Sequence, residues 1–387
     1  MTHLSRRASS RRATTEQDGG VIAGLLRVRH VPVRSRLLLS IVLGCVAGIM
    51  TARESARVPV PRDFGPVWFA ARSILHGVDP YPLVGPGLTF DWVSPLVYPI
   101  TAAFVAIPFA PFSQPIASIL FASIGGALFA WALMEYGYGP LFGFFSLAVR
   151  EAAAAAQWSL LFSASLIVSP ISFLLIAKPT IGAVFFLARP RRIAIVGAVM
   201  LCAAAFVVQP TWVIDWIDAV QRYVAQGAPD RPYRTILSFP GGILPLLCLM
   251  RWRRPEARLL AAHVCVPITL MAYETVPLFL VPRTFWEAAL LVGCSFAQRR
   301  LTLALTPLPW THGRMTATSG LLFVLLLYLP ATVMILRRSN TGRLPIWLER
   351  VAERLPGWLR GSADDPDCSN GRFRVSYSRD DDVSARR

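Results

Sequence analysis

Charge is scarce in this sequence. Only 16% of its 387 residues are Asp, Glu, Lys or Arg, whereas 54% are hydrophobic and the mean hydropathy is +0.50. A soluble domain needs more charge than this at its surface. Apolar runs lie between the charged segments, and a helix needs about 20 such residues to cross a bilayer. Because lipid offers the backbone no water, such runs must be helical. The composition excludes an ordinary soluble domain and predicts an all-α polytopic membrane protein.

Lysine is almost absent, because Lys178 is the only one and every other basic side chain is Arg. The formal net charge of +17 does not indicate a nucleic-acid partner, since the arginines gather beside the apolar runs. That placement is typical of cytoplasmic segments, where arginine also attracts anionic lipid headgroups. The arginines in question are Arg6, Arg7, Arg11, Arg12, Arg27, Arg29, Arg34, Arg36, Arg189, Arg191, Arg192, Arg251, Arg253, Arg254 and Arg258.

Three further absences narrow the possible functions. The six cysteines lack metal-ligand spacing, and five of them lie in apolar runs as small hydrophobic residues. No cleavable signal is evident, so the first apolar run, 37–51, is expected to stay as an anchor. No internal repeat is found, which argues against a transporter built from inverted repeats.

The chain divides into three parts. Residues 1–35 are polar and basic and are predicted to form a disordered cytoplasmic N-terminus. Residues 36–338 hold the apolar runs and are predicted to form one transmembrane domain of about ten helices. Several runs are too short to span alone, so some are expected to form broken or re-entrant helices. Residues 339–387 are predicted to be a charged, largely disordered tail.

The arginine segments also predict an orientation. If 189–192 lies inside, one crossing places 209–235 outside, and the next returns 251–254 to the inside. A further crossing then places Tyr273 and Glu274 near the outer face. The polar, aromatic stretch 53–98 is expected outside the cytoplasm, against the membrane.

Within that stretch, Asp63 opens an amphipathic pattern. Apolar side chains follow at helical spacing, Pro66 falls in the first turn and Gly77 fits the C-terminal stop. The spacing predicts a short interfacial helix. By spacing alone Asp63 is its N-cap; the alternative is a catalytic base.

Other polar residues carry two interpretations each. Lys178 lies between apolar runs, where a cation is either a functional group or a lysine that snorkels to the interface. Gln157, inside an apolar helix, either bonds between helices or faces a cavity. Asp79-Pro80-Tyr81 is typical of a turn, and Tyr98 fits the aromatic belt of a membrane interface.

The order of these motifs resembles glycosyltransferase family 87, the polyprenol-phosphate-mannose-dependent mannosyltransferase-like proteins of the GT-C superfamily. The resemblance spans about residues 37–300 and rests on the Asp-Phe motif ending in Asp-Pro-Tyr, a Tyr-Pro before a span, a helix opened by Gln, Lys-Pro-Thr, and a late Tyr followed by an acid. The chain departs from the family pattern at three places. It has Ile100 for the second Pro of Tyr-Pro-Pro, Ala156 for the Gly of Gly-Gln, and Glu274 for the Asp of Tyr-Asp.

The resemblance implies a GT-C-like bundle in the plasma membrane with its active site on the extracytoplasmic side. It implies Asp63 as general base, with Gln157, Lys178, Tyr273 and Glu274 lining the cavity. The donor is expected to be a polyprenyl-phosphate sugar, most simply mannose, and the acceptor a glycolipid or glycan hydroxyl. No cofactor is expected, and the first loop has no Asp-x-Asp pair that demands a divalent metal.

The chemistry of such a transfer is consistent with these residues. An aspartate of reference pKa about 3.9 is ionised at neutral pH and can take the proton of the attacking hydroxyl. A leaving phosphate needs positive charge, for which Lys178, Arg72 and His76 are candidates. Tyr81 and Tyr98 complete the predicted substrate-binding set. Single displacement implies inversion. The rival hypotheses are a transporter or flippase, and a catalytically degenerate member of the family.

Overall fold

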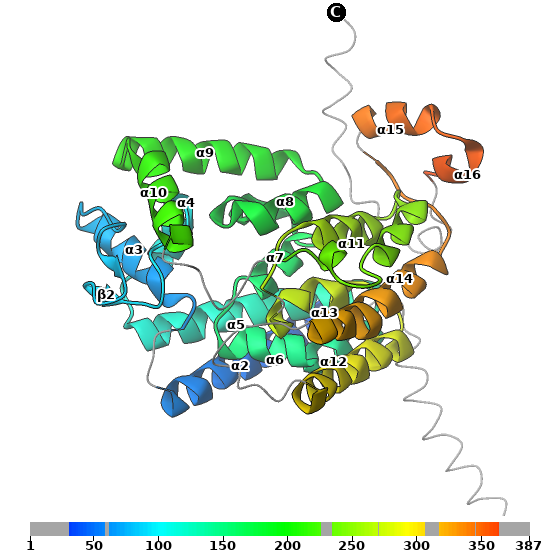
Figure 1. Ribbon diagram of the computed structural model, residues 1–387, viewed down its shortest axis with the longest axis horizontal. Coiled ribbons are helices and arrows are strands. Elements are labelled where there is room, and N and C mark those ends of the chain that lie inside the picture. Colours follow the sequence, from blue (N-terminus) through cyan, green and yellow to red (C-terminus); the bar gives the residue numbers. More distant parts are fainter. Residues whose placement is uncertain are drawn as a thin grey trace, which may run out of the picture.

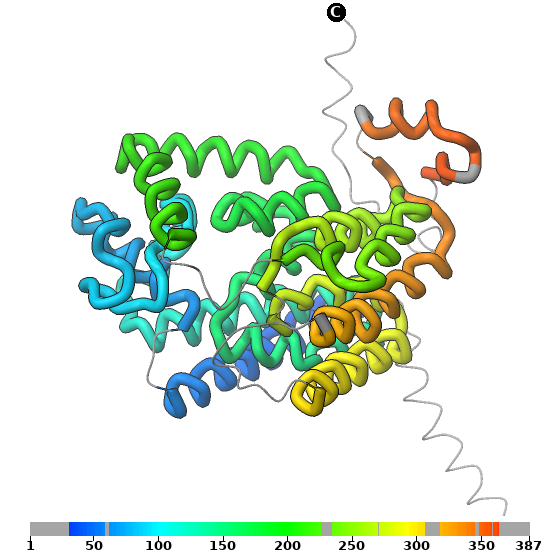
Figure 2. The backbone as a smooth tube through the Cα atoms, viewed as in Figure 1, coloured from blue at the N-terminus to red at the C-terminus, as the bar shows by residue number. Residues whose placement is uncertain are grey.

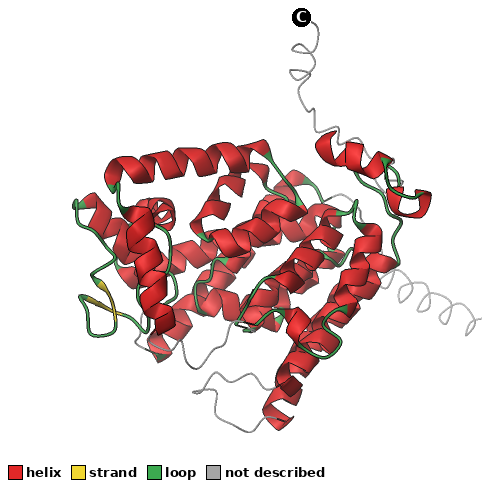
Figure 3. Cartoon of the chain, turned by 45° about the horizontal axis from the view of Figure 1, so that its top comes forward, coloured by secondary structure: helices red, strands yellow, loops and turns green. Residues whose placement is uncertain are grey.

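The computed structural model describes residues 31–58, 62–225, 234–269, 271–305, 317–344 and 346–363. Over these ranges the chain is helical, which confirms the all-α prediction (Figure 1). The described strands are two parallel pieces of two residues each, β1 (Val84–Gly85) and β2 (Phe90–Asp91), in the first loop (Figure 3). The predicted N-terminal disorder over 1–35 falls almost wholly outside the described residues.

The helices follow one another with short connections. The α-helices are α2 (Val33–Arg57), α3 (Gly65–Leu75), α4 (Ile100–Ala106), α5 (Gln114–Leu133), α6 (Leu147–Ala154), α7 (Ser159–Ser165), α8 (Pro179–Ala188), α9 (Arg192–Val208), α10 (Trp212–Ala225), α11 (Pro255–Cys265), α12 (Phe285–Leu305), α13 (Ala317–Phe323), α14 (Leu329–Leu336), α15 (Ile346–Glu353) and α16 (Gly357–Arg360). Tighter 3-10 segments join them: η1 (Ile107–Phe109), η2 (Met134–Tyr136), η3 (Gly139–Phe145), η4 (Ser169–Ala177), η5 (Ile236–Ser238), η6 (Leu244–Arg251) and η7 (Ala272–Leu280), while η9 (Val324–Tyr328) is a π-helix.

Three helical segments are long and apolar enough to cross a membrane: Val33–Arg57, Gln114–Tyr136 and Thr318–Leu336. A fourth candidate is the pair Arg192–Val208 and Trp212–Ala225, which is bent by 94° at its break. These segments indicate a membrane protein. The other apolar runs form shorter helices, 3-10 segments, or part of α12, which has 21 residues but is not among the candidate spans, so the larger number of about ten transmembrane or re-entrant helices stays a prediction.

Small residues allow α2 and α5 to pack closely. A Cβ atom added at Gly44 would lie 2.6 Å from the carbonyl oxygen of Ser123, and one at Gly126 would lie 2.6 Å from the Cβ of Ala47. Arg36 at the start of α2 pairs with Glu135, just after α5, at 3.0 Å, so the two helices run antiparallel. Close approach through small side chains is the usual way in which helices associate in lipid.

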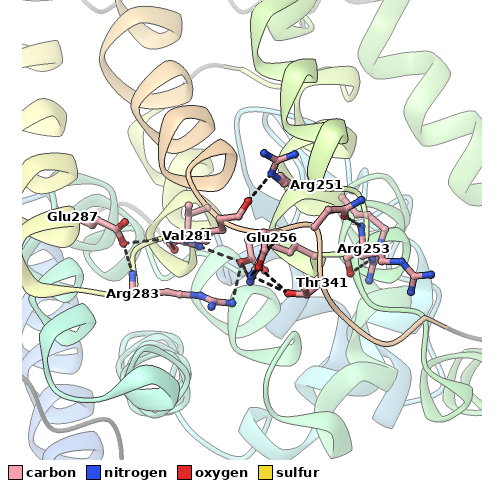
Figure 4. A network of polar contacts seen from close by, with 12 residues as sticks. Arg251, Arg253, Glu256, Val281, Arg283, Glu287 and Thr341 are labelled. Atoms are coloured by element: carbon pink, nitrogen blue, oxygen red, sulfur yellow. Dashed lines mark hydrogen bonds and ion pairs between the residues drawn. The ribbon is translucent and has the colours of Figure 1, made fainter. Parts of the chain in front are cut away.

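The arginine segments gather at one end of the helices, the right side of Figure 1. There the buried carboxylate of Glu256 lies 3.1 Å from Arg338, 3.2 Å from Arg283 and 3.6 Å from Arg254 (Figure 4). Arg338 also pairs with Glu287 at 3.1 Å. We call this the arginine end. A carboxylate shared by three guanidinium groups offsets the cost of burying each charge.

The arginine segments 189–192 and 251–258 lie at the same end. Arg258 donates to the carbonyl of Ala188 at 3.0 Å, which brings the 189–192 segment beside the 251–258 segment. At the opposite end, Gln209 after α9 donates to Asp79 of the first loop at 2.9 Å. The chain trace shows the two ends at opposite sides of the molecule (Figure 2). This is the arrangement that the positive-inside orientation requires, although the side that faces the cytoplasm stays a prediction.

The predicted tail from residue 339 begins with ordered structure. Glu349 of α15 accepts two hydrogen bonds of 2.9 Å from Arg253, and Trp252 donates to Leu359 of α16 at 2.7 Å. The two short helices α15 and α16 therefore dock on the arginine end. Residues 364–387 lie outside the described part of the chain.

Candidate functional site

Asp63 is held in a tight corner between α2 and α3. The side chain of the preceding Arg62 is 8% exposed and donates to the carbonyl of Glu54 at 2.9 Å and to the hydroxyl of Ser55 at 3.2 Å. The backbone N–H of Asp63 donates to the carbonyl of Ala155 at 3.1 Å. These bonds tie the corner to the end of α2 and to the residues after α6, so the position of Asp63 is set by two separate elements.

Asp63 lies one residue before the N-cap of the helix that follows it. The N-cap residue of α3 is Phe64, and no side-chain capping hydrogen bond is formed. Instead, the Asp63 carboxylate accepts a hydrogen bond from Nε2 of Gln157, which is 5% exposed. The predicted N-cap position is therefore taken by Phe64 rather than by Asp63, and Gln157 bonds between segments as one of its two interpretations predicted.

A helix break brings Gln157 to this position. The chain leaves α6 at Ala154, and Ala156 has φ +52°, the left-handed region that L residues other than Gly rarely adopt. The backbone of Gln157 then bonds to Ala152 at 2.8 Å before α7 begins. Glycine adopts this backbone conformation without the strain that the Cβ atom of Ala156 imposes.

We expect Ala156→Gly and Ala156→Val to differ strongly in stability. Glycine relieves a left-handed backbone strain of about 1–2 kcal/mol but removes a buried methyl group worth about 1 kcal/mol, so its net effect should be small. Valine has a branched Cβ that disfavours this backbone further. Thermal unfolding of the purified variants in detergent should show a Tm near the wild-type value for glycine and a clearly lower one for valine. Equal losses for both would mean that the backbone at residue 156 is not left-handed.

Lys178 occupies a second break, between η4 and α8. The Thr101 hydroxyl at the start of α4 donates to the carbonyl of Ile176 at 3.1 Å, which fixes η4 beside the first loop. The Nζ atom of Lys178 then lies 5.7 Å from the ring centre of Tyr98, within the range of a cation–π contact. Burial, together with the negative charge of Asp63, raises the pKa of the Tyr98 hydroxyl. Tyr98 therefore lies close to both Lys178 and Asp63.

Tyr273 and Glu274 enter from η7. The Glu274 carboxylate accepts hydrogen bonds from the backbone N–H groups of Thr269 at 3.2 Å and Met271 at 3.1 Å. Burial raises the pKa of Glu274, and the positive charge of Lys178 offsets part of that effect. Burial, together with the negative charges of Glu274 and Asp63, raises the pKa of the Tyr273 hydroxyl, and the nearby Gln157 side chain offsets part of that effect. The two residues therefore face Lys178 and Gln157 from a third segment.

A pocket forms where these breaks meet. Four of the predicted residues line it, and Asp63 adjoins it through its bond to Gln157. The full lining is Gln157, Trp158, Ser159, Phe162, Lys178, Ile181, Phe185, Tyr273, Glu274 and Pro277. We call this space the Lys178 pocket.

The apolar lining residues were missed by the sequence analysis, although helical spacing carries a signal for them. Ile181 and Phe185 follow Lys178 at i+3 and i+7, so all three lie on one face of the α8 segment. Phe162 follows Trp158 at i+4 on α7 in the same way. A residue that lines the pocket at a helix break therefore identifies which helix face lines it, and apolar residues on the following turns of that face form the rest of the wall.

Two polar atoms of the wall lack partners. Among the described residues, neither Nε1 of Trp158 nor the hydroxyl of Ser159 has a hydrogen-bond partner, and both atoms are buried. Trp158 is 1% exposed and stacks with Phe162 at a ring separation of 5.5 Å. Unpaired buried donors are costly, so such atoms beside a pocket are expected to meet a ligand or water.

Three predicted residues lie elsewhere. Arg72 and His76 are exposed on or just after α3, and the Arg72 guanidinium lies 5.1 Å from the ring centre of Trp68. Tyr81 is buried in the first loop, and its hydroxyl donates to the carbonyl of Tyr98 at 3.2 Å. The structure thus brings Lys178 to the pocket, places Arg72 and His76 outside its lining, and gives Tyr81 a contact that supports Tyr98.

Over the described ranges, no three His, Cys, Asp or Glu side chains come together in a way that could hold a metal ion. Comparisons with protein-family models, curated proteins and solved structures find no match to this chain.

Proposed function

We propose that the protein is a membrane glycosyltransferase that moves a hexose, most simply mannose, from a polyprenyl-phosphate donor to the hydroxyl of a glycolipid or glycan. The observation that carries this proposal is the meeting of Asp63, Gln157, Lys178, Tyr273 and Glu274 at one pocket. These residues come from segments up to about 200 positions apart, as the motif order predicts. A base beside a lone cation, in a wall of aromatic residues, suits a sugar that carries a lipid phosphate.

In the proposed reaction, the Asp63 carboxylate takes the proton from the acceptor hydroxyl as the hydroxyl oxygen attacks the anomeric carbon. The bond between that carbon and the phosphate oxygen breaks, and its electron pair leaves with the polyprenyl phosphate. The displacement inverts the anomeric centre. The hydrogen bond from Gln157 orients the carboxylate toward the pocket, so that the base needs little reorganisation.

Lys178 is the proposed contact for the phosphate. The leaving group gains negative charge as the bond breaks, and a fixed cation stabilises that charge in a site with little water. Lys178 is the one Lys or Arg residue in the lining of the pocket, with Glu274 as its counter-charge. The unpartnered Trp158 Nε1 and Ser159 hydroxyl are available for hydroxyl groups of the sugar.

The proposal includes the finer architecture. We infer a GT-C-like bundle of about ten transmembrane or re-entrant helices in the plasma membrane, with the arginine end in the cytoplasm and the first loop outside. Helix breaks at Ala156 and Lys178 support this inference, because non-helical backbone at membrane depth is tolerated where it lines a cavity. The pocket is inferred to lie toward the end opposite the arginines, because α8 runs from Lys178 at the pocket to Ala188, whose carbonyl accepts a hydrogen bond from Arg258 at the arginine end.

A transfer assay tests the function. Membranes from cells that produce the protein should incorporate radiolabelled mannose from polyprenyl-phosphate mannose into a lipid or glycan fraction, above the level of membranes from cells without it. Uptake of label into vesicles without covalent incorporation would favour the transporter or flippase. Neither incorporation nor uptake, with donor binding retained, would favour the degenerate family member.

A further inference from the structure

A second pocket lies between α6 and α12, separate from the Lys178 pocket. Its lining shares no residue with that pocket and consists of Leu147, Arg150, Glu151, Phe296, Arg299, Arg300 and Leu303. The hydroxyl of Ser295 on α12 accepts a hydrogen bond from the backbone N–H of Leu147 at 3.3 Å, which joins the two helices beside the opening. About 570 Å³ of empty space lies within the pocket and its mouth.

The charges in this pocket do not balance. Arg299 lies 3.5 Å from Glu151 and is paired with it. Arg150 and Arg300 are exposed, and no hydrogen bond or ion pair joins either side chain to a described residue, although the charge of Arg150 acts on the neighbouring Glu151 carboxylate. Three arginines against one glutamate leave a net charge of +2 on the lining. A cavity with that charge favours a ligand that carries negative charge.

The choice of a lipid as the ligand rests on the proposed bundle of about ten helices, in which α12 crosses the membrane; α12 is not one of the four candidate spans that length and composition identify. The helix begins at Phe285, beside Arg283 of the arginine end. Arg299 is 14 residues further on, or about 21 Å at 1.5 Å per residue, which is two thirds of the roughly 30 Å hydrocarbon core. Arginine side chains extend several ångströms toward the headgroups. The guanidinium groups therefore reach the level of lipid phosphates in the leaflet opposite the arginine end.

From this geometry we infer that the pocket between α6 and α12 binds the phosphate headgroup of an anionic membrane lipid. The planar guanidinium groups of Arg150 and Arg300 take the phosphate oxygens, since that geometry matches phosphate in a bidentate manner. Phe296 and Leu303 at the same opening contact the acyl chains. A lipid, rather than free phosphate, is favoured because the charged groups and the apolar groups share one mouth at membrane depth.

The binding can be measured on the purified full-length protein in nonionic detergent. Dioctanoyl phosphatidylglycerol is titrated, and the rise in Tm gives the concentration of half-saturation. The wild-type protein should be stabilised by this lipid more than by dioctanoyl phosphatidylcholine, and inorganic phosphate should not compete. Equal stabilisation by the zwitterionic lipid, or displacement of the anionic lipid by inorganic phosphate, would overturn the assignment.

Variants that lower the positive charge of the pocket and a variant that raises it separate effects on lipid binding from effects on stability. Each arginine near a lipid phosphate contributes about a fivefold change in affinity, so the double variant Arg150→Gln/Arg300→Gln should weaken half-saturation about 25-fold. Glu151→Gln releases Arg299 and raises the pocket charge, so it should tighten binding several-fold, even if its own Tm falls. Arg222→Gln, an exposed arginine on α10, is the matched control and should change nothing. Weakening by Glu151→Gln, or an equal effect of Arg222→Gln, would contradict the site.

Discussion

Asp63→Asn is expected to abolish sugar transfer while the protein stays folded. Asparagine is nearly isosteric with aspartate and can still accept the hydrogen bond from Gln157, so the corner between α2 and α3 should persist. It cannot take a proton from the acceptor hydroxyl. Loss of a general base costs about 10²- to 10⁴-fold in rate, and we expect kcat to fall by that factor while donor binding changes little. The measurement is single-turnover transfer of labelled sugar by the purified variant.

Asp91→Asn is the matched control for this variant. Asp91 lies in the same loop, but it is exposed and accepts only from the backbone of Gly87 among the hydrogen bonds described here. Its variant should transfer sugar at the wild-type rate. A wild-type rate for Asp63→Asn, with the same Tm, would show that Asp63 only holds the corner together. Loss of rate with a large fall in Tm would instead assign it a role in folding.

Lys178→Ala is expected to weaken donor binding by about tenfold or more. Removing a charge-assisted contact to phosphate costs about 1.5–3 kcal/mol, and the chain has no other Lys or Arg side chain in the pocket lining to replace it. Binding of the acceptor should change much less, because the acceptor is expected to lie on the Asp63 side. Titration of the donor and of an acceptor analogue separates the two effects. Lys178→Arg keeps the charge and should retain part of the affinity.

The uniqueness of Lys178 permits a direct control. It is the only lysine in 387 residues, so an amine reagent applied to protein with a blocked N-terminus reports on this one side chain. Bound polyprenyl-phosphate sugar should protect Lys178 from modification, whereas the acceptor alone should not. Unchanged donor affinity in Lys178→Ala, with no protection of the wild type, would make Lys178 a lysine that reaches toward the interface.

Much of the architecture follows from composition. Scarce charge and long apolar runs predict helices in a membrane, and arginine placement predicts that the segments 189–192 and 251–254 share one end. The structure places them there, where Glu256 is shared by Arg254, Arg283 and Arg338. The individual pairs could not be predicted from the sequence, because they join residues up to 82 positions apart whose meeting depends on how the helices pack.

Some of the polar residues of the site could be predicted from the sequence, because polar side chains are costly in an apolar environment. Residues such as Gln157 and Lys178 are costly in an apolar environment, so their presence points to a cavity or to a partner. Spacing alone favoured Asp63 as a helix cap, because local sequence holds no information on Gln157 lying 94 positions away. The exposure of Arg72 and His76 could not be predicted for the same reason. Both follow Asp63 in the sequence, on or just after α3, and only the tertiary packing decides which face of α3 is buried.

The helix breaks were the least predictable feature. Ala156 is a strong helix former by propensity, yet it adopts a left-handed backbone that ends α6 and turns Gln157 toward Asp63. Tertiary contacts override the local preference here, as the 3.1 Å bond from Asp63 to Ala155 illustrates.

The most direct measurement is a structure of the protein in a lipid nanodisc with a non-transferable donor, a polyprenyl phosphonate whose sugar is joined through carbon. We predict that its phosphonate lies beside Nζ of Lys178, with the anomeric carbon facing the Asp63 carboxylate across the Lys178 pocket. A donor bound elsewhere, with Asp63 and Lys178 untouched by the ligand, would contradict the account.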